Sequence, residues 1–222
     1  MLTKSAGEKS PGLTSTGIPC IFLFLFNISQ ARHMDQTHCI QKIRSAVQTA
    51  VHPFPPDPAL FQPTSVMALF VFNEVLELLF IQKADVEGYP WRNQMAFPGG
   101  HVDEQDASTQ ETALRELKEE MGICAENVRV IGSLGHFQTI NNKDIEAFAG
   151  IWNRQEKITH DTAEISRVLP IPVSHLTRLH REKGYAGRRP NIMELTYPYE
   201  DVVIWGVTAK ILHHLIEVIT SR

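Results

Sequence analysis

One short stretch, residues 108–122, constrains the fold of this chain more than any other, because both of its ends carry the marks of helix ends. Ser108 and Glu111 have the spacing of a capping box, and Gly122 stands where a left-handed residue closes a helix. At about 100° per residue, one side of this helix carries three carboxylates: Glu116, Glu119 and Glu120. A separate apolar side is predicted to pack on a core: Leu114, Leu117 and Met121.

Two interpretations of these carboxylates are open. Like charges one turn apart cost only about 0.2–0.5 kcal/mol in an exposed helix, so the glutamates could form an ordinary solvated face. Upstream, the segment "AFPGGHVDEQD" places Gly99 and Gly100 before the helix, where glycine allows another group to approach the backbone closely. A free carbonyl beside carboxylates suits Mg²⁺ or Mn²⁺, which prefer oxygen ligands, and the combination favours a metal site. From like-charge repulsion alone, Glu120→Gln is expected to stabilise the metal-free protein.

The composition of the chain limits its class. Its 222 residues, 43% of them hydrophobic, suit one domain with a proper core and leave room for a tail. A net charge of −4 and a pI of about 6.2 argue against a broad nucleic-acid-binding surface. The three cysteines, Cys20, Cys39 and Cys124, form no CxxC pair, so neither a disulfide framework nor a cysteine zinc site is expected. Such cysteine usage fits a reducing compartment, and we predict a cytoplasmic protein.

The first 33 residues differ from the rest of the chain. A small, polar stretch leads into "IPCIFLFLFNI", an apolar run of 11 residues that is too short to span a bilayer. Three interpretations are open: a dispensable extension, a signal or anchor, and an extra element of the fold. We predict an N-terminal extension over 1–33, without stable membrane insertion, and one domain over 34–222.

From residue 34 onward the sequence predicts a mixed α/β domain. The spacing of apolar residues predicts a first helix over 40–51 and a last helix over 207–219. The segments "SVMALFVF" and "VLELLFIQ", separated by Asn73-Glu74, have the composition of a hairpin of buried strands. Further strands are predicted at 127–135, 145–152, 164–169, 192–196 and 201–204.

The segment "GGHVDEQDASTQETALRELKEEMGI" resembles the Nudix box. Seven residues match its second half, which runs Arg-Glu-aliphatic-x-Glu-Glu-x-Gly-aliphatic: Arg115, Glu116, Leu117, Glu119, Glu120, Gly122 and Ile123. The resemblance covers roughly residues 65–215 and implies a Nudix-type α/β/α sandwich with a mixed β-sheet. It also implies a pyrophosphohydrolase, which hydrolyses phosphoric anhydride bonds with the help of Mg²⁺ or Mn²⁺.

Within this family the chain is similar to the coenzyme A pyrophosphatases. One extra residue separates Gly100 from Arg115, and Asp106 stands where a glutamate is usual. The segments "PWRNQMAFPGG" and "VIWGVTAKIL" are also similar to that branch. The similarity implies cleavage of coenzyme A or acyl-CoA into 3′,5′-ADP and phosphopantetheine.

The chain departs from this branch in one signature. Lys83-Ala84 stands for its first arginine pair, and Gly88 or Tyr89 occupies the place of its second arginine. Glycine and tyrosine cannot replace a bidentate phosphate-binding guanidinium. Another nucleoside diphosphate derivative or a nucleoside triphosphate as the substrate therefore stays open, and so does a Nudix nucleotide sensor without catalysis.

The resemblance implies roles for the residues of the box. Four groups are the implied metal ligands: Glu116, Glu119, Glu120 and the carbonyl oxygen of Gly100. Arg115 is implied to orient a glutamate. The general base is implied to be either a box glutamate, Glu119, or an acid from a later loop, Glu146 or Glu164. The first interpretation of Glu146 and of Glu164 is nevertheless a structural or solvent-facing residue, and Glu164 is expected to support the fold.

Basic residues outside the box are the candidates for substrate binding. Arg92 is close enough in sequence to compensate for the missing arginine, and the segment 178–189 gathers five cations. The first interpretation of this segment is an ordinary solvated loop; in the alternative, Arg188 and Arg189 bind the 3′-phosphate of coenzyme A.

Two neighbouring residues have competing interpretations. Tyr185 is interpreted as an ordinary loop tyrosine, with stacking on an adenine as the alternative, and His101 as loop structure rather than a metal ligand. The predicted partner of the protein is a small nucleotide or coenzyme substrate, without nucleic acid, and a homodimer is compatible with the sequence.

Overall fold

The computed structural model of this chain describes residues 20–88 and 91–221, and their side chains from residue 35 onward. The chain divides into two compact units, Met1–Cys39 and Ile40–Arg222. The described backbone of the first unit is helical and belongs to α1 (Cys20–Thr49). Residues 1–19 of the predicted extension lie outside the described residues, so the dispensable extension stays a prediction.

The predicted first helix over 40–51 is wrong at both ends. Helix α1 begins upstream of residue 40, and it ends at Thr49. Ile43 and Val47 are buried as expected, but Val51 is 84% exposed. The proline-rich segment that follows Val51 cannot continue a helix, so the chain leaves the helical conformation before this residue. No described helix combines the length and the apolar character that a membrane span requires.

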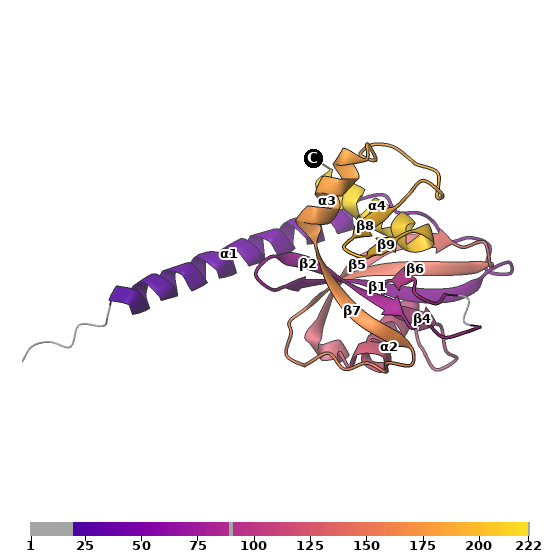
Figure 1. The fold of residues 1–222 in the computed structure, drawn as a ribbon, viewed down its shortest axis with the longest axis horizontal. Helices are drawn as coiled ribbons and strands as arrows, with labels where there is room; N and C mark the ends of the chain where they lie inside the picture. Colours follow the sequence, from indigo (N-terminus) through magenta and orange to yellow (C-terminus); the bar gives the residue numbers. More distant parts are fainter. Residues whose placement is uncertain (1–19, 89–90, 222) are drawn as a thin grey trace, which may run out of the picture. The chain divides into compact units, whose positions relative to one another are not determined.

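A seven-stranded mixed sheet forms the centre of the second unit (Figure 1). Its main path runs in the order β3-β2-β1-β6-β5, with β4 paired to β1 and β7 paired to β2. The sheet is mixed because β1 is parallel to β6 and antiparallel to β2. The strands are β1 (Gln62–Phe72), β2 (Leu76–Lys83), β3 (Met95–Ala96), β4 (Gly99–His101), β5 (Val128–Gln138), β6 (Lys143–Trp152) and β7 (Ile165–Pro172).

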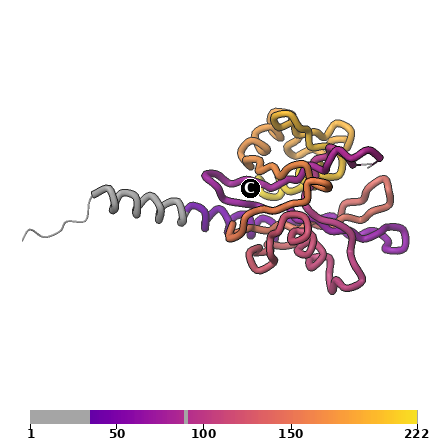
Figure 2. Tube along the Cα trace, turned by 60° about the horizontal axis from the view of Figure 1, so that its bottom comes forward, coloured from indigo at the N-terminus to yellow at the C-terminus, as the bar shows by residue number. Residues whose placement is uncertain are grey.

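Helices cover both faces of this sheet, which confirms the predicted α/β/α sandwich. Helix α2 (Thr109–Met121) packs on one face, and α3 (Val173–Glu182) and α4 (Gly206–Thr220) lie on the other (Figures 1 and 2). Beneath α2, the fully buried side chains of Leu117 and Met121 pack against β1 and β2 residues such as Leu69 and Ile81. The predicted hairpin is confirmed as well, because Leu69 pairs with Leu79 across β1 and β2.

The ends of α2 are closed as the sequence predicts. The Ser108 hydroxyl accepts a hydrogen bond from the Glu111 N–H at 3.2 Å. Gly122 has a φ of 69°, and its N–H donates to the Lys118 carbonyl at 3.0 Å. Because both caps are local, the residues at which the acidic helix begins and ends are set by the nearby sequence.

Two predictions for the C-terminal third are wrong. No strand covers 192–196 within the described residues; instead β8 (Tyr197–Tyr199) and β9 (Val202–Ile204) form a separate two-stranded sheet. Helix α3 was not predicted, and it includes the first part of the segment that was interpreted as a basic loop. This helix has only 10 residues and buries a histidine, so its sequence lacks a continuous apolar stripe.

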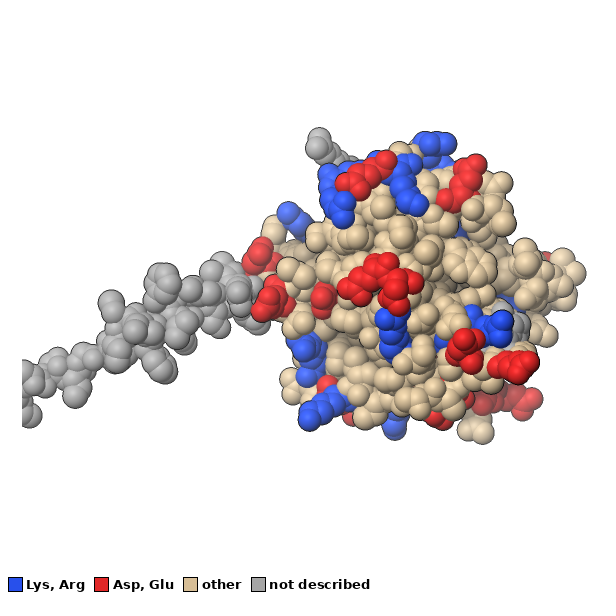
Figure 3. All heavy atoms as spheres, viewed as in Figure 1, with Lys and Arg blue, Asp and Glu red and all other residues tan. Residues whose placement is uncertain are grey.

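Charged side chains are interspersed on the domain surface. On the face in Figure 3, Lys and Arg alternate with Asp and Glu and form no large basic surface. This distribution agrees with the net charge of −4.

One carboxylate fastens the segment after α2 to the end of β6. Glu156 accepts hydrogen bonds from the Cys124 N–H at 2.8 Å, from Asn127 Nδ2 at 2.7 Å and from Trp152 Nε1 at 2.9 Å. Although burial raises the pKa of Glu156, these hydrogen bonds outweigh it and lower the pKa to about 2. The charged form is therefore more favourable in the folded state than in the unfolded state.

We expect Glu156→Gln to lower the free energy of unfolding at pH 7 by about 1–3 kcal/mol, because an amide cannot accept all three donors. The folded pKa lies below the unfolded one, so this stabilisation is present above pH 4.5 and is lost as the pH falls toward about 2. Urea denaturation across this range should show a weaker pH dependence in the variant. Glu126→Gln, at an exposed position, is the control, and equal losses in both variants would contradict the prediction.

Candidate active site

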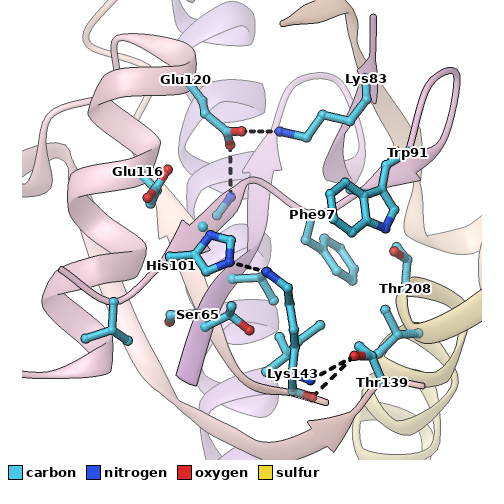
Figure 4. Close-up of a pocket in the computed structure, with 18 of the residues that line it drawn as sticks. Ser65, Lys83, Trp91, Phe97, His101, Glu116, Glu120, Thr139, Lys143 and Thr208 are labelled. Atoms are coloured by element: carbon cyan, nitrogen blue, oxygen red, sulfur yellow. Dashed lines mark hydrogen bonds and ion pairs between the residues drawn. The ribbon is translucent and has the colours of Figure 1, made fainter. Parts of the chain in front are cut away.

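A cavity of about 620 Å³ opens between the N-terminal part of α4, the strand β4 and the acidic face of α2 (Figure 4). This volume suits a ligand of nucleotide size. Its lining includes three carboxylates, two lysines, an imidazole and an indole: Glu116, Glu120, Glu164, Lys83, Lys143, His101 and Trp91. The cavity therefore combines oxygen ligands for a hard cation with positive charges for an anionic substrate.

Two glycines bring the backbone of β4 against its neighbours. Gly100 pairs with Ser65 and Gly99 with Val66 across β4 and β1. Gly99 has a φ of +150°, and a Cβ there would lie 2.1 Å from the Ser65 carbonyl oxygen. A Cβ on Gly100 would lie 2.3–2.6 Å from the carboxylate atoms of Glu116. Only glycine at these two positions permits this approach, which places the Gly100 main chain directly beside the Glu116 carboxylate.

Glu120 is buried and fully paired at the floor of the site. Its carboxylate accepts a hydrogen bond from the Gly99 N–H at 2.9 Å and forms an ion pair with Lys83 Nζ at 2.5 Å (Figure 4). The Lys83 side chain is only 17% exposed. Lys83 thus neutralises a carboxylate that the sequence predicts as a metal ligand.

Arg115 connects the other carboxylates of the helix. Its guanidinium donates to Asp106, to Glu116 at 3.0 Å and to Glu119 at 2.8 Å. The hydrogen bonds from Arg115 hold the pKa of Asp106 well below its usual range. Burial raises the pKa of Glu116, and Arg115 opposes that shift. Asp106 stands at a position of the motif where glutamate is usual. It holds Arg115 in place, and Arg115 in turn contacts Glu116.

The three candidate bases occupy different surroundings. Glu119 is exposed, bound to Arg115, and is not among the cavity-lining residues. Glu146 is committed to Thr109 at 2.5 Å and to Ser133 at 2.8 Å. Glu164 is exposed and lines the cavity, and its carboxylate makes no hydrogen bond or ion pair within the described residues. Of the three, Glu164 has both the access and the free oxygens that a base requires.

The opposite wall of the cavity carries an aromatic ring and a second cation. Lys143 Nζ lies 5.7 Å from the centre of the Trp91 ring and contacts His101 Nε2 (Figure 4). The buried ring of Phe97 lies on the same side. His101 is thus engaged by Lys143, in agreement with its interpretation as a structural residue rather than a ligand.

The predicted substrate arginines lie outside this cavity lining. Arg92 is exposed and lies 3.8 Å from Asp85. Arg188 donates to the Gly184 carbonyl, and it and Arg189 are exposed. Their binding to a 3′-phosphate therefore stays an untested prediction.

Tyr185 is not a loop tyrosine with a free ring. Its side chain is buried, and its hydroxyl donates to the Glu194 carbonyl at 2.6 Å. A ring in this position cannot stack on an adenine, so that alternative is wrong. Tyr185 does lie in a loop, as predicted, but its side chain is buried. The residue belongs to the packing between α3 and the segment before β8.

Sequence reasoning did not select three residues of the site. In the sequence, Lys83 stands out only as a departure from an arginine signature, and no pattern there assigns a role to Trp91 or Lys143. A lysine at the end of a predicted buried strand was the one signal for Lys83, because a charge there needs a partner. Nothing local marks Trp91 or Lys143, which face each other only after folding.

The comparisons with known proteins agree with the geometry. The sequence profile of the NUDIX domain matches residues 62–195. A protein named "Uncharacterized Nudix hydrolase NudL" from Pectobacterium atrosepticum is 31% identical over 147 residues, which cover 65% of this chain and 76% of that protein. A protein of the same name from Yersinia enterocolitica is 34% identical over 124 residues, which cover 55% of this chain and 64% of that protein.

A solved structure is also similar in outline. The structure of a MutT/nudix family protein from Enterococcus faecalis aligns with 83% of this chain and 67% of its own, at 19% identity and a TM-score of 0.45. That similarity is too weak to support a conclusion by itself. The profile match and the Pectobacterium relative, together with the glutamate helix beside Gly100, establish that this chain belongs to the Nudix hydrolase family.

Proposed function

We propose that this protein is a Mg²⁺- or Mn²⁺-dependent pyrophosphohydrolase that cleaves the diphosphate linkage of a nucleoside diphosphate derivative. Coenzyme A or an acyl-CoA is the first candidate substrate, and 3′,5′-ADP and phosphopantetheine would be its products. One observation carries the proposal: the Glu116 and Glu120 carboxylates meet the Gly99–Gly100 backbone in a nucleotide-sized cavity that also contains Lys83 and Lys143.

The oxygen groups of the site suit a hard divalent cation. Glu116, Glu120 and the Gly100 carbonyl would hold the ion, with Glu119 as a further ligand, since Mg²⁺ and Mn²⁺ prefer carboxylate and carbonyl oxygens. The absence of a Cβ at Gly100 leaves the room that such a ligand set needs beside Glu116. When bound, the ion supplies charge neutralisation and a more acidic water.

In this proposal, Lys83 and Lys143 also neutralise the phosphates of the substrate. Lys83 pairs with Glu120 in the metal-free protein, and a bound divalent ion would release it from that pairing. Its ammonium group would then face the diphosphate. Lys143, on the opposite wall, is placed to neutralise a second phosphate oxygen.

We assign the general base to Glu164. Water attacks one phosphorus, its proton passes to the Glu164 carboxylate, and the anhydride P–O bond breaks so that the second phosphate leaves with the bridging oxygen. Glu164 is exposed and borders the cavity, whereas Glu119 is bound to Arg115. Arg115 acts as a positioning residue, because it contacts Glu116 and Glu119.

Two features bear on the substrate. Trp91 borders the cavity and offers a face on which a base can stack, with Lys143 beside the ring. In the cavity, Lys83 stands in place of the first arginine of the coenzyme A signature. Lysine binds phosphate as a point charge and without bidentate geometry, so an ADP-sugar or a dinucleotide is the second candidate.

Product analysis over a panel of substrates tests the proposal. The panel contains coenzyme A, acetyl-CoA, 3′-dephospho-coenzyme A, ADP-ribose, a diadenosine polyphosphate and nucleoside triphosphates, each with Mg²⁺ and with Mn²⁺. We expect hydrolysis of a diphosphate linkage, fastest for a coenzyme A derivative. Nucleotide binding without hydrolysis of any member would replace this proposal with a sensor function.

We expect Glu120→Gln to reduce kcat/KM by more than the roughly 10–100-fold effect of losing an outer-shell partner, because it removes a charged metal ligand. The same substitution leaves Lys83 without its carboxylate and should cost about 1–3 kcal/mol of metal-free stability. This reverses the expectation from helix repulsion alone. Glu111→Gln, on the same helix, serves as the control, and activity within threefold of wild type at saturating Mg²⁺ would exclude the assignment.

Substitutions of two glutamates test which of them is the general base. Glu164→Gln should lower kcat by about 10²–10⁴-fold, with little change in metal affinity, because it removes only the proton acceptor. Glu119→Gln should act mainly on metal affinity. A kcat measured at saturating Mn²⁺ distinguishes the two, and the opposite pattern would return the base to Glu119.

Gly100→Ala tests the approach between β4 and α2. The backbone of Gly100 is not left-handed, so alanine is tolerated locally, but its methyl group must displace the Glu116 carboxylate. We expect an unchanged thermal melt and about 10–100-fold lower activity. Gly132→Ala in β5 is the matched control, since its Cβ would make an ordinary 3.5 Å contact with Val47. Full activity of Gly100→Ala would show that Glu116 does not need its present position.

A further inference from the structure

A second group of potential ligands lies at the other end of α4. His213 and Glu217 are one helical turn apart on α4, and His180 faces them from the last turn of α3. One ligand atom from each side chain lies within 4.8 Å of the others. Residues four apart share one face of a helix, so this arrangement does not depend on loop geometry.

The histidine on α4 has an unused nitrogen. His213 Nε2 is the one buried side-chain nitrogen or oxygen in the described part of the chain without a hydrogen-bond partner. The His213 and His180 rings lie 4.9 Å apart between centroids. Burial, and then the neighbouring His180, lower the pKa of His213, which favours the neutral form of the ring. A neutral imidazole with a free nitrogen is the form that binds metals.

His180, on α3, has the kind of outer hydrogen bond that metal-binding histidines have. His180 is 1% exposed, and its Nε2 lies 2.8 Å from Glu217 Oε1. Its other nitrogen, Nδ1, lies 2.9 Å from the hydroxyl of Tyr197. A metal-binding histidine typically uses its second nitrogen in such an outer hydrogen bond, which fixes the ring and its tautomer.

We propose that His180, His213 and Glu217 form a binding site for a borderline transition-metal ion, with Zn²⁺ as the best match to two imidazoles and one carboxylate. Ligand atoms around a tetrahedral zinc ion are about 3.3 Å apart. The ion would therefore widen the 2.8 Å contact between His180 and Glu217 and draw His213 Nε2 inward. A water molecule would occupy the fourth position. Mg²⁺ and Mn²⁺ prefer oxygen ligands, so this site differs in chemistry from the acidic helix.

The site is separate from the cavity and has a structural role. Ile211 is the last α4 residue that lines the cavity, and Glu217 lies six residues further along the helix, a rise of about 9 Å. None of His180, His213 and Glu217 lines the cavity. The Gly187 N–H donates to Glu217 at 3.0 Å, and the Tyr185 N–H donates to the His180 carbonyl at 3.0 Å. An ion here would fasten α3, α4 and the segment that carries Arg188 to one another. The inference does not rest on the proposed hydrolysis.

Metal analysis of the untagged full chain tests this site. The chain is purified from zinc-supplemented cells without chelators, exchanged into buffer with excess Mg²⁺, and its zinc content is measured by mass spectrometry. We expect about one zinc per chain, in both the wild type and the Glu116→Gln/Glu120→Gln double variant. His213→Gln should lose this zinc, and His175→Gln, at a half-buried histidine on α3 outside the cluster, should keep it.

Thermal denaturation with added Zn²⁺ gives a second readout that needs no enzymatic activity. Zn²⁺ should raise the Tm of the chelator-treated wild type and of His175→Gln, and leave that of His213→Gln unchanged. If His213→Gln does not fold, Glu217→Gln takes its place in both measurements. A wild type without zinc whose Tm does not respond to Zn²⁺ would overturn the proposal. Equal zinc content in the wild type and in His213→Gln would overturn it as well.

Discussion

The approach of the Gly100 backbone to the Glu116 carboxylate is the contact on which the rest of the site depends. It requires that β4 pair with β1 and that α2 pack beneath the sheet, because each element supplies one side of the contact. A single methyl group at Gly100 would fill the space between them. The same arrangement brings the Gly99 N–H to Glu120. One close backbone approach therefore positions two carboxylates of the helix.

Charge balance is the second constraint on this site. Three glutamates on one helical turn repel one another, and Lys83 and Arg115 neutralise them in this structure. Neither cation is an incidental surface partner, since Lys83 is largely buried and Arg115 is fixed by Asp106. A divalent ion that enters the site would compete directly with Lys83. Metal binding and substrate binding are thus coupled through one lysine in the proposed mechanism.

Helix α4 links the two sites for which we propose metal binding. Its first turns border the nucleotide-sized cavity, and its later turns carry His213 and Glu217. The two ligand sets differ in chemistry, one of oxygens and one mainly of imidazoles, so each selects a different class of ion. Because they lie on one rigid helix, loss of the ion at the histidines would loosen an element that also shapes the cavity.

The sequence by itself determined the acidic helix, its caps, the first hairpin and the family, because these follow from residues close together in the chain. The helix over 109–121 is capped by Ser108 and Gly122 through local hydrogen bonds. The spacing of the motif residues is a property of the sequence and does not depend on how the helix packs. The tertiary structure alone decided what surrounds the helix. The contacts of Lys83 with Glu120 and of His180 with Glu217 each join residues 37 positions apart, and they exist only because separate elements pack side by side. Like-charge repulsion could be predicted from a helical wheel, and Arg115 neutralises part of it from the same helix. The cation that pairs with Glu120 is Lys83 at the end of β2, and no local sequence pattern encodes that contact.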